Sequence, residues 1–220
     1  MAIDRVRILA TVAALMAPAS LWAGPVSGLV RTSTQPGIAP APAVVYAEPI
    51  DKAPGTRAAS VTLTQKNKTF TPRVVAVPVG STVEFPNNDP IFHNVFSLSG
   101  PQPFDLGLYR SGQSRARRFT APGTYRVFCN IHPQMSALVV VVPTPHVTVT
   151  DPDGRYVLDL PPGRYRITAV SERSDPVAME LESSAGATAA PDLTLDESSW
   201  ILVQHKNKFG ADYPASAYRQ

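Results

Sequence analysis

The stretch Cys129-Asn130-Ile131-His132-Pro133-Gln134-Met135 decides how this chain is interpreted. It holds the only cysteine of the chain, and two residues separate that cysteine from a histidine and the histidine from a methionine. A second histidine, His93, lies upstream in Asp89-Pro90-Ile91-Phe92-His93-Asn94-Val95. The two stretches together offer one thiolate, two imidazoles and one thioether.

These four side chains match the donor set of a type 1 copper site, in which two histidines and a cysteine form a trigonal plane and a methionine is a weak axial ligand. We therefore predict one type 1 copper ion held by His93, Cys129, His132 and Met135. The alternative for Met135 is a place in the core with no bond to the metal.

A strand that ends at Cys129 would deliver the thiolate, with Tyr125 and Val127 on the same side. The following turn must then bring the histidine and methionine back to the ion, and Pro133 stiffens that turn because its φ is fixed. His93 must come from another strand, which attaches the site to the core. We expect Asn94, its neighbour, to hydrogen-bond across to the ligand loop and support the site geometry.

The first residues predict export. A short segment with Arg5 and Arg7 precedes a mostly apolar run from Ile8 to Trp22, and Ala23 offers a small residue for cleavage. This pattern is typical of a secretory signal peptide over residues 1–23 and predicts a periplasmic protein. The alternative, a membrane anchor, is disfavoured because the run is short for a spanning helix and contains Pro18. A single cysteine in an exported protein makes no intramolecular disulfide, so a free thiol, an intermolecular bridge and a metal ligand remain.

The formal charge of +3 is small and gives no indication of nucleic-acid binding. One cluster of arginines (Arg110, Arg115, Arg117 and Arg118) is expected to be a solvated strand face. Steering of a partner by this cluster is the alternative.

Short β-rich runs separated by Pro, Gly, Asn and Asp predict an all-β fold, as a sandwich or barrel. The runs are 61–64, 73–77, 81–85, 116–120, 124–128 and 136–142. Residues 139–142 are continuously apolar, which predicts burial on both faces.

A second block of strands and turns follows Pro145. It contains a turn and strand at Asp153-Gly154-Arg155-Tyr156, followed by a second turn and strand at Pro161-Pro162-Gly163-Arg164-Tyr165. It resembles transthyretin-like, carboxypeptidase-regulatory-like β-sandwich domains, which usually begin with a Gly-x-Val strand such as the one at Gly28. We therefore expect 25–50 to belong with 144–204, the copper domain (58–142) to be inserted between them, and 205–220 to be a tail that is loosely ordered from Asp212 onward. Two sandwiches in tandem with an N-terminal extension are the alternative.

The motif residues resemble those of the cupredoxins, whose fold is a Greek-key β-sandwich. The Cys-x2-His-x2-Met spacing is similar to the short ligand loop of amicyanin, and His93-Asn94-Val95 is similar to both amicyanin and plastocyanin. The wider sequence resembles plastocyanin-like proteins often labelled methylamine utilisation proteins. Asn130 and Ile131 depart from the usual threonine and proline of the amicyanin-like loop, which leaves the ligands intact.

This resemblance implies copper binding and one-electron transfer with a redox protein such as a c-type cytochrome or a dehydrogenase. Two other classes stay open: a periplasmic copper-handling protein, and an interaction module for carbohydrate or protein in which copper is structural. We expect no enzyme, because a catalytic copper site would need three further histidines and only His146 and His205 remain. Neither of these two is expected to bind metal.

Overall fold

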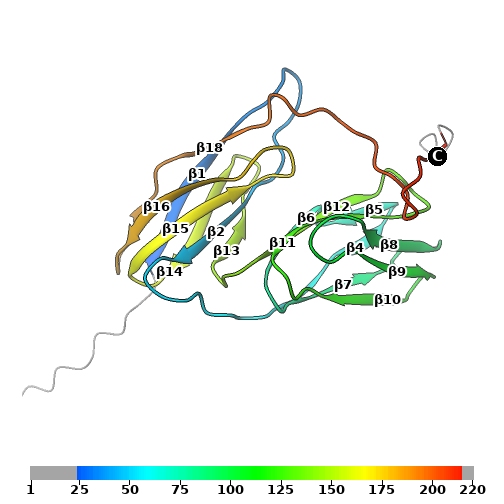
Figure 1. Cartoon of the computed structure of the whole chain (residues 1–220), viewed down its shortest axis with the longest axis horizontal. Helices are drawn as coiled ribbons and strands as arrows, with labels where there is room; N and C mark the ends of the chain where they lie inside the picture. The colour runs from blue at the N-terminus through cyan, green and yellow to red at the C-terminus, as the bar shows by residue number, and fades with distance from the viewer. Residues whose placement is uncertain (1–23, 215–220) are drawn as a thin grey trace, which may run out of the picture.

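The computed structural model describes residues 24–214, so the predicted signal peptide at 1–23 lies outside the described residues, as do residues 215–220. The described residues form strands and no helix, so the predicted all-β class is confirmed. No helix within 24–214 has the length and apolar character needed to cross a membrane. The strands form two β-sandwiches, which follow one another along the longest axis of the molecule (Figure 1).

Sandwich I, as we call the first, contains the strands of residues 60–142. Its larger sheet has the order β6-β12-β11-β8-β9, its smaller sheet the order β10-β7-β3, and β4 pairs with β5 in a hairpin. The bounds are β3 (Ser60–Thr62), β4 (Thr64–Lys66), β5 (Thr69–Thr71), β6 (Val74–Pro78), β7 (Thr82–Pro86), β8 (His93–Ser97), β9 (Phe104–Tyr109), β10 (Ser114–Arg118), β11 (Gly123–Phe128) and β12 (Ser136–Val142).

Sandwich II combines strands from both sides of sandwich I in the sequence. One sheet has the order β14-β1-β17, with β18 also on β1, and the other has the order β13-β2-β15-β16. The bounds are β1 (Gly24–Ser33), β2 (Val44–Pro49), β13 (Val147–Val149), β14 (Arg155–Leu160), β15 (Gly163–Val170), β16 (Val177–Ser183), β17 (Thr188–Ala189) and β18 (Leu193–Asp196).

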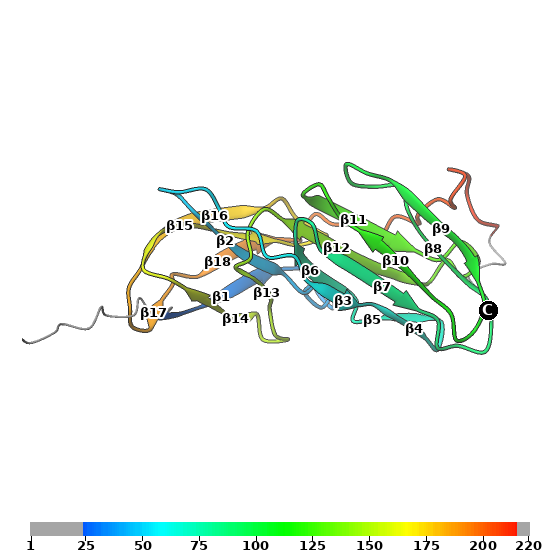
Figure 2. The ribbon, with the colours of Figure 1, turned by 90° about the horizontal axis from the view of Figure 1, so that it is seen from below.

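Strand β12 shows how the sequence sets the packing. Alternate side chains point to opposite faces of a strand. Ala137, Val139 and Val141 enter the core of sandwich I. Leu138 and Val140 enter a second apolar cluster, together with Val44 of β2. The predicted two-sided burial of residues 139–142 is thus confirmed, and the outer face of β12 is where the two sandwiches meet (Figure 2).

Polar contacts flank this apolar interface. Arg73 forms an ion pair with Glu172 at 2.6 Å, and Arg126 donates to the carbonyl oxygen of Glu172 at 2.8 Å. These contacts join the start of β6 and the middle of β11 to the loop after β15. The division of the chain at 25–50, 58–142, 144–204 and 205–220 stays a prediction, although β1 and β2 each lie between strands of the C-terminal block.

The sequence predicted a loosely ordered tail from Asp212 onward, but Asp212 and Tyr213 both make contacts in the structure. Asp212 pairs with Lys206, and the Tyr213 hydroxyl donates to the carbonyl oxygen of Cys129 at 3.4 Å. The physical reason is the route of the chain after β18, which brings it across to the end of sandwich I that carries Cys129 (Figure 1). A composition-based expectation does not include such long-range contacts.

Candidate metal centre

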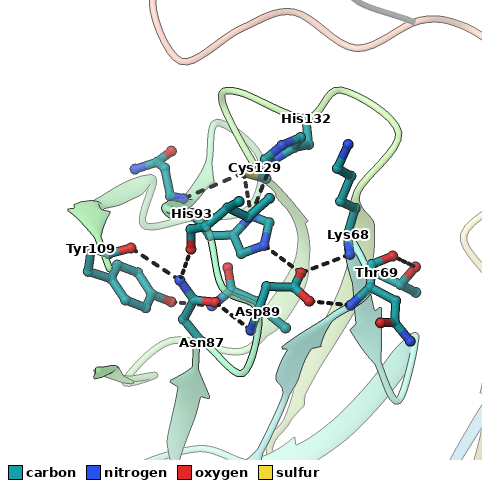
Figure 3. A network of polar contacts seen from close by, with 12 residues as sticks. Lys68, Thr69, Asn87, Asp89, His93, Tyr109, Cys129 and His132 are labelled. Carbon is teal, nitrogen blue, oxygen red and sulfur yellow. Dashed lines mark hydrogen bonds and ion pairs between the residues drawn. The ribbon is translucent and has the colours of Figure 1, made fainter. Parts of the chain in front are cut away.

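Three of the predicted ligands converge at one end of sandwich I. Sγ of Cys129 lies 3.6 Å from Nδ1 of His93 and 3.7 Å from Nδ1 of His132, and the two Nδ1 atoms are 3.2 Å apart. His93 and Cys129 are fully buried, and His132 is 8% exposed. Two nitrogens and one sulfur therefore face a common point, as Figure 3 shows.

This nearly equilateral triangle has the size of a trigonal metal site. Its centre lies about 2.0 Å from each corner, which is close to the bond lengths of about 2.0–2.3 Å that imidazole nitrogen and thiolate sulfur form with a divalent transition metal. A soft thiolate beside two imidazoles, in a buried pocket, is the donor set that copper prefers. The residues thus fit copper.

The elements of sandwich I deliver these donors as the sequence predicted. Cys129 directly follows β11, and its side chain shares the core with Tyr125 and Val127. His93 opens β8, which is hydrogen-bonded to β11. His132 lies on the loop between β11 and β12. The three donors thus come from the neighbouring strands β8 and β11 and from the loop that follows β11.

The loop itself is closed by its own backbone. The amide of Cys129 donates to the carbonyl oxygen of Met135 at 3.3 Å, and the amide of Met135 donates to that of His132 at 2.9 Å. Met135 is buried in the same apolar cluster as Cys129. Its predicted axial role stays a prediction, because burial in the core suits either alternative.

A carboxylate lies behind His93. Nε2 of His93 is 2.8 Å from Oδ2 of Asp89, and both side chains are buried. Since Nδ1 faces the other donors, Nε2 carries the proton, and this N–H group donates a hydrogen bond to the carboxylate. A carboxylate on the far nitrogen fixes the tautomer and ring orientation of a metal-binding histidine and makes it a stronger donor.

The β4–β5 hairpin turn holds Asp89 in place. The amides of Asn67 and Lys68 donate to the two carboxylate oxygens at 2.5 and 2.8 Å. Both residues have positive φ, 54° and 52°, which is the backbone of a tight hairpin turn. Burial would raise the pKa of Asp89, but the amide of Lys68, the ring of His93 and the amide of Asn67 outweigh it and lower that pKa. The carboxylate is therefore ionised at neutral pH.

Asn94 contributes in a different way from the one expected. Its backbone amide, not its side chain, reaches the ligand loop and donates to Sγ of Cys129 at 3.5 Å. Its side-chain amide donates to Oδ1 of Asp105 at 2.6 Å. An N–H aimed at the sulfur stabilises charge there, so Asn94 supports the thiolate through the backbone.

The electrostatics of the centre favour a neutral imidazole at His132 and oppose a free thiolate at Cys129. Burial, with smaller effects of His93 and Lys68, lowers the pKa of His132. Burial raises the pKa of the Cys129 thiol, against the amides of Asn94, Ile131 and His132. A metal ion that binds here must therefore displace the thiol proton.

Three apolar residues next to the two histidines in sequence are exposed. Ile91 and Phe92 precede His93, and Ile131 precedes His132; all three are exposed, Phe92 to 52%. Figure 3 shows Lys68 extending along the His132 side of the centre. The imidazole of His132 is the most exposed of the three converging donors.

The other two histidines are not among the three converging groups. His146 contacts the carbonyl oxygen of Asp159 in sandwich II, and His205 stacks on Phe128. The sequence interpretation missed Asp89 and the C-terminal contacts to the loop. The Asn88-Asp89-Pro90 turn four residues before His93 was a usable signal for Asp89, whereas the C-terminal contacts depend on the tertiary fold.

Comparison with known proteins identifies sandwich I. The profile of the family "Copper binding proteins, plastocyanin/azurin family" matches residues 57–142. The chain is 39% identical over 79 residues to amicyanin-alpha of Methylorubrum extorquens, a match that covers 34% of this chain and 66% of that protein, just under two thirds. A similar structure is the copper-containing nitrite reductase of Thermus scotoductus, at 28% identity and a TM-score of 0.37, covering 51% of this chain and 28% of that one.

The match to plastocyanin of Ulva prolifera covers more of the relative. The identity is 32% over 72 residues, which is 29% of this chain and 74% of plastocyanin. With the family profile over residues 57–142 and the buried triangle of two imidazoles and one thiolate, this resemblance to the cupredoxins is confirmed: the chain belongs to the plastocyanin/azurin family of copper-binding proteins.

Proposed function

We propose that this protein is an exported, periplasmic electron carrier, with one type 1 copper held by His93, Cys129, His132 and Met135. The observation that carries the proposal is the triangle of Sγ and two Nδ1 atoms, with sides of 3.2 to 3.7 Å. Bound copper supplies one-electron chemistry, by alternating between Cu(II) and Cu(I). The chain supplies the geometry, the shielding from water and the route for the electron.

The geometry supports rapid exchange because little needs to move. Cys129 and His93 are buried on adjacent strands, and Asp89 holds the ring of His93 from behind. Donors that keep one arrangement in both oxidation states lower the reorganisation that each electron transfer requires. A carrier needs this rigidity, whereas a protein that takes up and releases copper needs exposed, mobile ligands.

The route for the electron is the imidazole of His132. Its Nδ1 lies 3.7 Å from Sγ of Cys129, and it is the most exposed of the three converging donors. Ile91, Phe92 and Ile131, exposed neighbours of the two histidines in sequence, would form an apolar rim around it. A redox protein such as a c-type cytochrome or a dehydrogenase would dock on this rim. An apolar contact surface suits a short-lived complex, because it excludes water without requiring specific ion pairs.

The test compares electron exchange with copper retention in the full mature chain. We expect fast electron exchange with a small c-type cytochrome in stopped-flow mixing, and slow release of copper to a competing chelator. Cys129→Ser is the control and should abolish the exchange. Slow exchange together with ready loss of copper would instead identify a copper-handling protein and refute the carrier.

A further inference from the structure

The C-terminal segment leaves sandwich II and ends against the ligand loop. After β18 the chain crosses to the far end of sandwich I, where residues 205–213 lie beside residues 128–133 (Figure 1). We call residues 205–213 the C-terminal clasp. The copper-binding family profile ends at residue 142, so this segment lies outside the matched region.

His205 and Tyr213 of the clasp contact both ends of the loop. The ring of His205 stacks on Phe128 with 3.8 Å between centroids and 14° between planes, and its Nε2 lies 2.7 Å from the carbonyl oxygen of Pro133. The Tyr213 hydroxyl donates to the carbonyl oxygen of Cys129. These contacts fix the backbone before and after Asn130, Ile131 and His132.

Lys208 reaches the loop and the sulfur by two routes. Its amide donates to Oδ1 of Asn130 at 2.9 Å, which anchors the middle of the loop. Its Nζ pairs with Asp105 at 2.7 Å, and the other carboxylate oxygen of Asp105 accepts from the side chain of Asn94. The backbone amide of Asn94 donates to Sγ of Cys129, so a chain of contacts runs from Lys208 to the thiolate.

The clasp has its own internal order. Oδ1 of Asn207 accepts from the amides of Phe209 and Ala211, and Gly210 takes the positive φ of 79° that this turn requires. Lys206 pairs with Asp212 on the exposed side, where an ion pair adds little to the order of the turn. The turn thus presents His205 and Lys208 to the loop in one arrangement.

We propose that the C-terminal clasp holds the copper ligand loop, and that His205 and Lys208 are positioning residues for Cys129 and His132. This inference rests on the proposed function, because it concerns the same centre. Two backbone hydrogen bonds close the loop from within, and the contacts of the clasp add to them from outside and further limit its opening. A loop that opens less often releases copper more slowly and keeps the sulfur in one position.

Variants of the clasp should fold, because the clasp is not part of a described core. The three apolar clusters of the described residues contain no residue beyond Leu195. Substitution of His205 therefore removes side-chain contacts to Phe128 and Pro133, and substitution of Lys208 removes the Nζ contact to Asp105 while its backbone amide still reaches Asn130. Neither change opens a cavity in a sandwich. This separates loss of positioning from loss of the fold.

The experiment uses the full mature chain with His205→Ala, His205→Phe, Lys208→Met and Lys208→Arg. Amide hydrogen exchange of residues 129–135 is measured in the copper-free protein, and copper release to a chelator in the loaded protein. We expect His205→Ala and Lys208→Met to speed both, with copper release about 10-fold faster, as for loss of other groups that orient metal ligands. His205→Phe keeps the stacking and Lys208→Arg keeps the ion pair, so both should lie closer to wild type.

Lys206→Met is the matched control, because Lys206 is in the same segment but pairs with Asp212 away from the loop. It should leave both rates unchanged. Rates for His205→Ala and Lys208→Met equal to those of Lys206→Met would overturn the clasp, as would a changed reduction potential with unchanged amide exchange. Amide exchange in copper-free protein tests the clasp even if the loaded protein proves to be no electron carrier.

Discussion

At the scale of single residues, the two ring nitrogens of His93 have separate partners. Nδ1 faces Cys129 and His132, and Nε2 donates to Asp89. Asp89 in turn accepts two backbone amides from the hairpin turn at Asn67 and Lys68. The orientation of His93 is therefore set by β8 on one side and by a hairpin far from it in sequence on the other.

Asp89→Asn tests this arrangement. A neutral amide removes the negative charge behind His93 and turns an N–H group toward one of the amides that the carboxylate accepts. The weaker imidazole donor should stabilise Cu(II) less, so the reduction potential should rise and copper affinity should fall about 10–100-fold. A redox titration and a copper competition assay measure both. An unchanged potential in a folded variant would show that Asp89 does not act through His93.

Met135 is tested by a pair of substitutions with opposite effects. A weak thioether favours Cu(I), because it donates little to Cu(II). Met135→Gln supplies a harder oxygen donor and should lower the reduction potential, whereas Met135→Leu removes the donor and should raise it. If both variants shift the potential alike, or leave it as in wild type, Met135 is a core residue and no ligand.

The sequence predicted the converging donors because their types and spacing are local information. His93, Cys129 and His132 needed only the assumption of neighbouring strands. Lys208 was missed because its contacts arise only in the folded chain, whereas Asp89 was missed although the Asn88-Asp89-Pro90 turn just before His93 was a local signal. Asn94 was correctly predicted to hydrogen-bond to the ligand loop, but the atom involved was not predicted. Its side chain bonds to Asp105, and its backbone amide donates to Sγ of Cys129.

At the scale of elements, strand β12 connects sandwich I to sandwich II. One face fills the core of sandwich I, and the other face packs on β2 and β13 of sandwich II. The strand also pairs with β11, which leads to the ligand loop, and in parallel with β6. Its seven residues therefore connect the metal centre to the interface between the sandwiches.

Leu138→Ala tests the outer face of β12. Leu138 is buried in the interface cluster, so its truncation leaves a cavity and should lower the free energy of unfolding by about 2–5 kcal/mol. Leu202→Ala is the control at a position that is 80% exposed, where a change within about 0.5 kcal/mol is expected. Urea unfolding measures both. Equal midpoints for the two variants would mean that the sandwiches are not held together through β12.

Strand prediction succeeded where the apolar residues gave a clear local signal, as in the continuously apolar β12 and the alternating β14. Among the strands that it missed are β9 and β16. Strand β9 contains Asp105 and Gly107, and its pairing with β8 is irregular between Asn94 and Phe96. Strand β16 reads Val-Ala-Met-Glu-Leu-Glu-Ser, and Ala, Met, Glu and Leu favour helix, so its pairing with β15 overrides local propensity.

At the scale of the whole molecule, sandwich II depends on residues from both sides of sandwich I. Strand β1 lies between β14 and the pair β17 and β18, and β2 lies between β13 and β15. Each is a central strand whose loss would divide a sheet. The apolar cluster of sandwich II likewise mixes Val26 and Val45 with Leu158 and Ile167.

Fragments test the insertion prediction. A fragment of residues 55–143 contains every strand of sandwich I and should fold and bind copper. A fragment of residues 144–220 lacks β1 and β2, would expose unpaired strand edges and should not unfold cooperatively. Circular dichroism and thermal melting compare the two. A cooperative transition for 144–220 alone would favour two independent sandwiches in tandem.

The central claim is that Cys129 and two histidines bind one copper ion as a type 1 site. The most direct measurement is a copper titration of residues 24–220, followed by visible absorption and electron paramagnetic resonance, beside the same measurements on Cys129→Ser. The account predicts an intense visible band from the copper–thiolate bond that saturates at about one ion per chain and is missing in Cys129→Ser. A copper-loaded protein without this band, or a band that persists in Cys129→Ser, would contradict it.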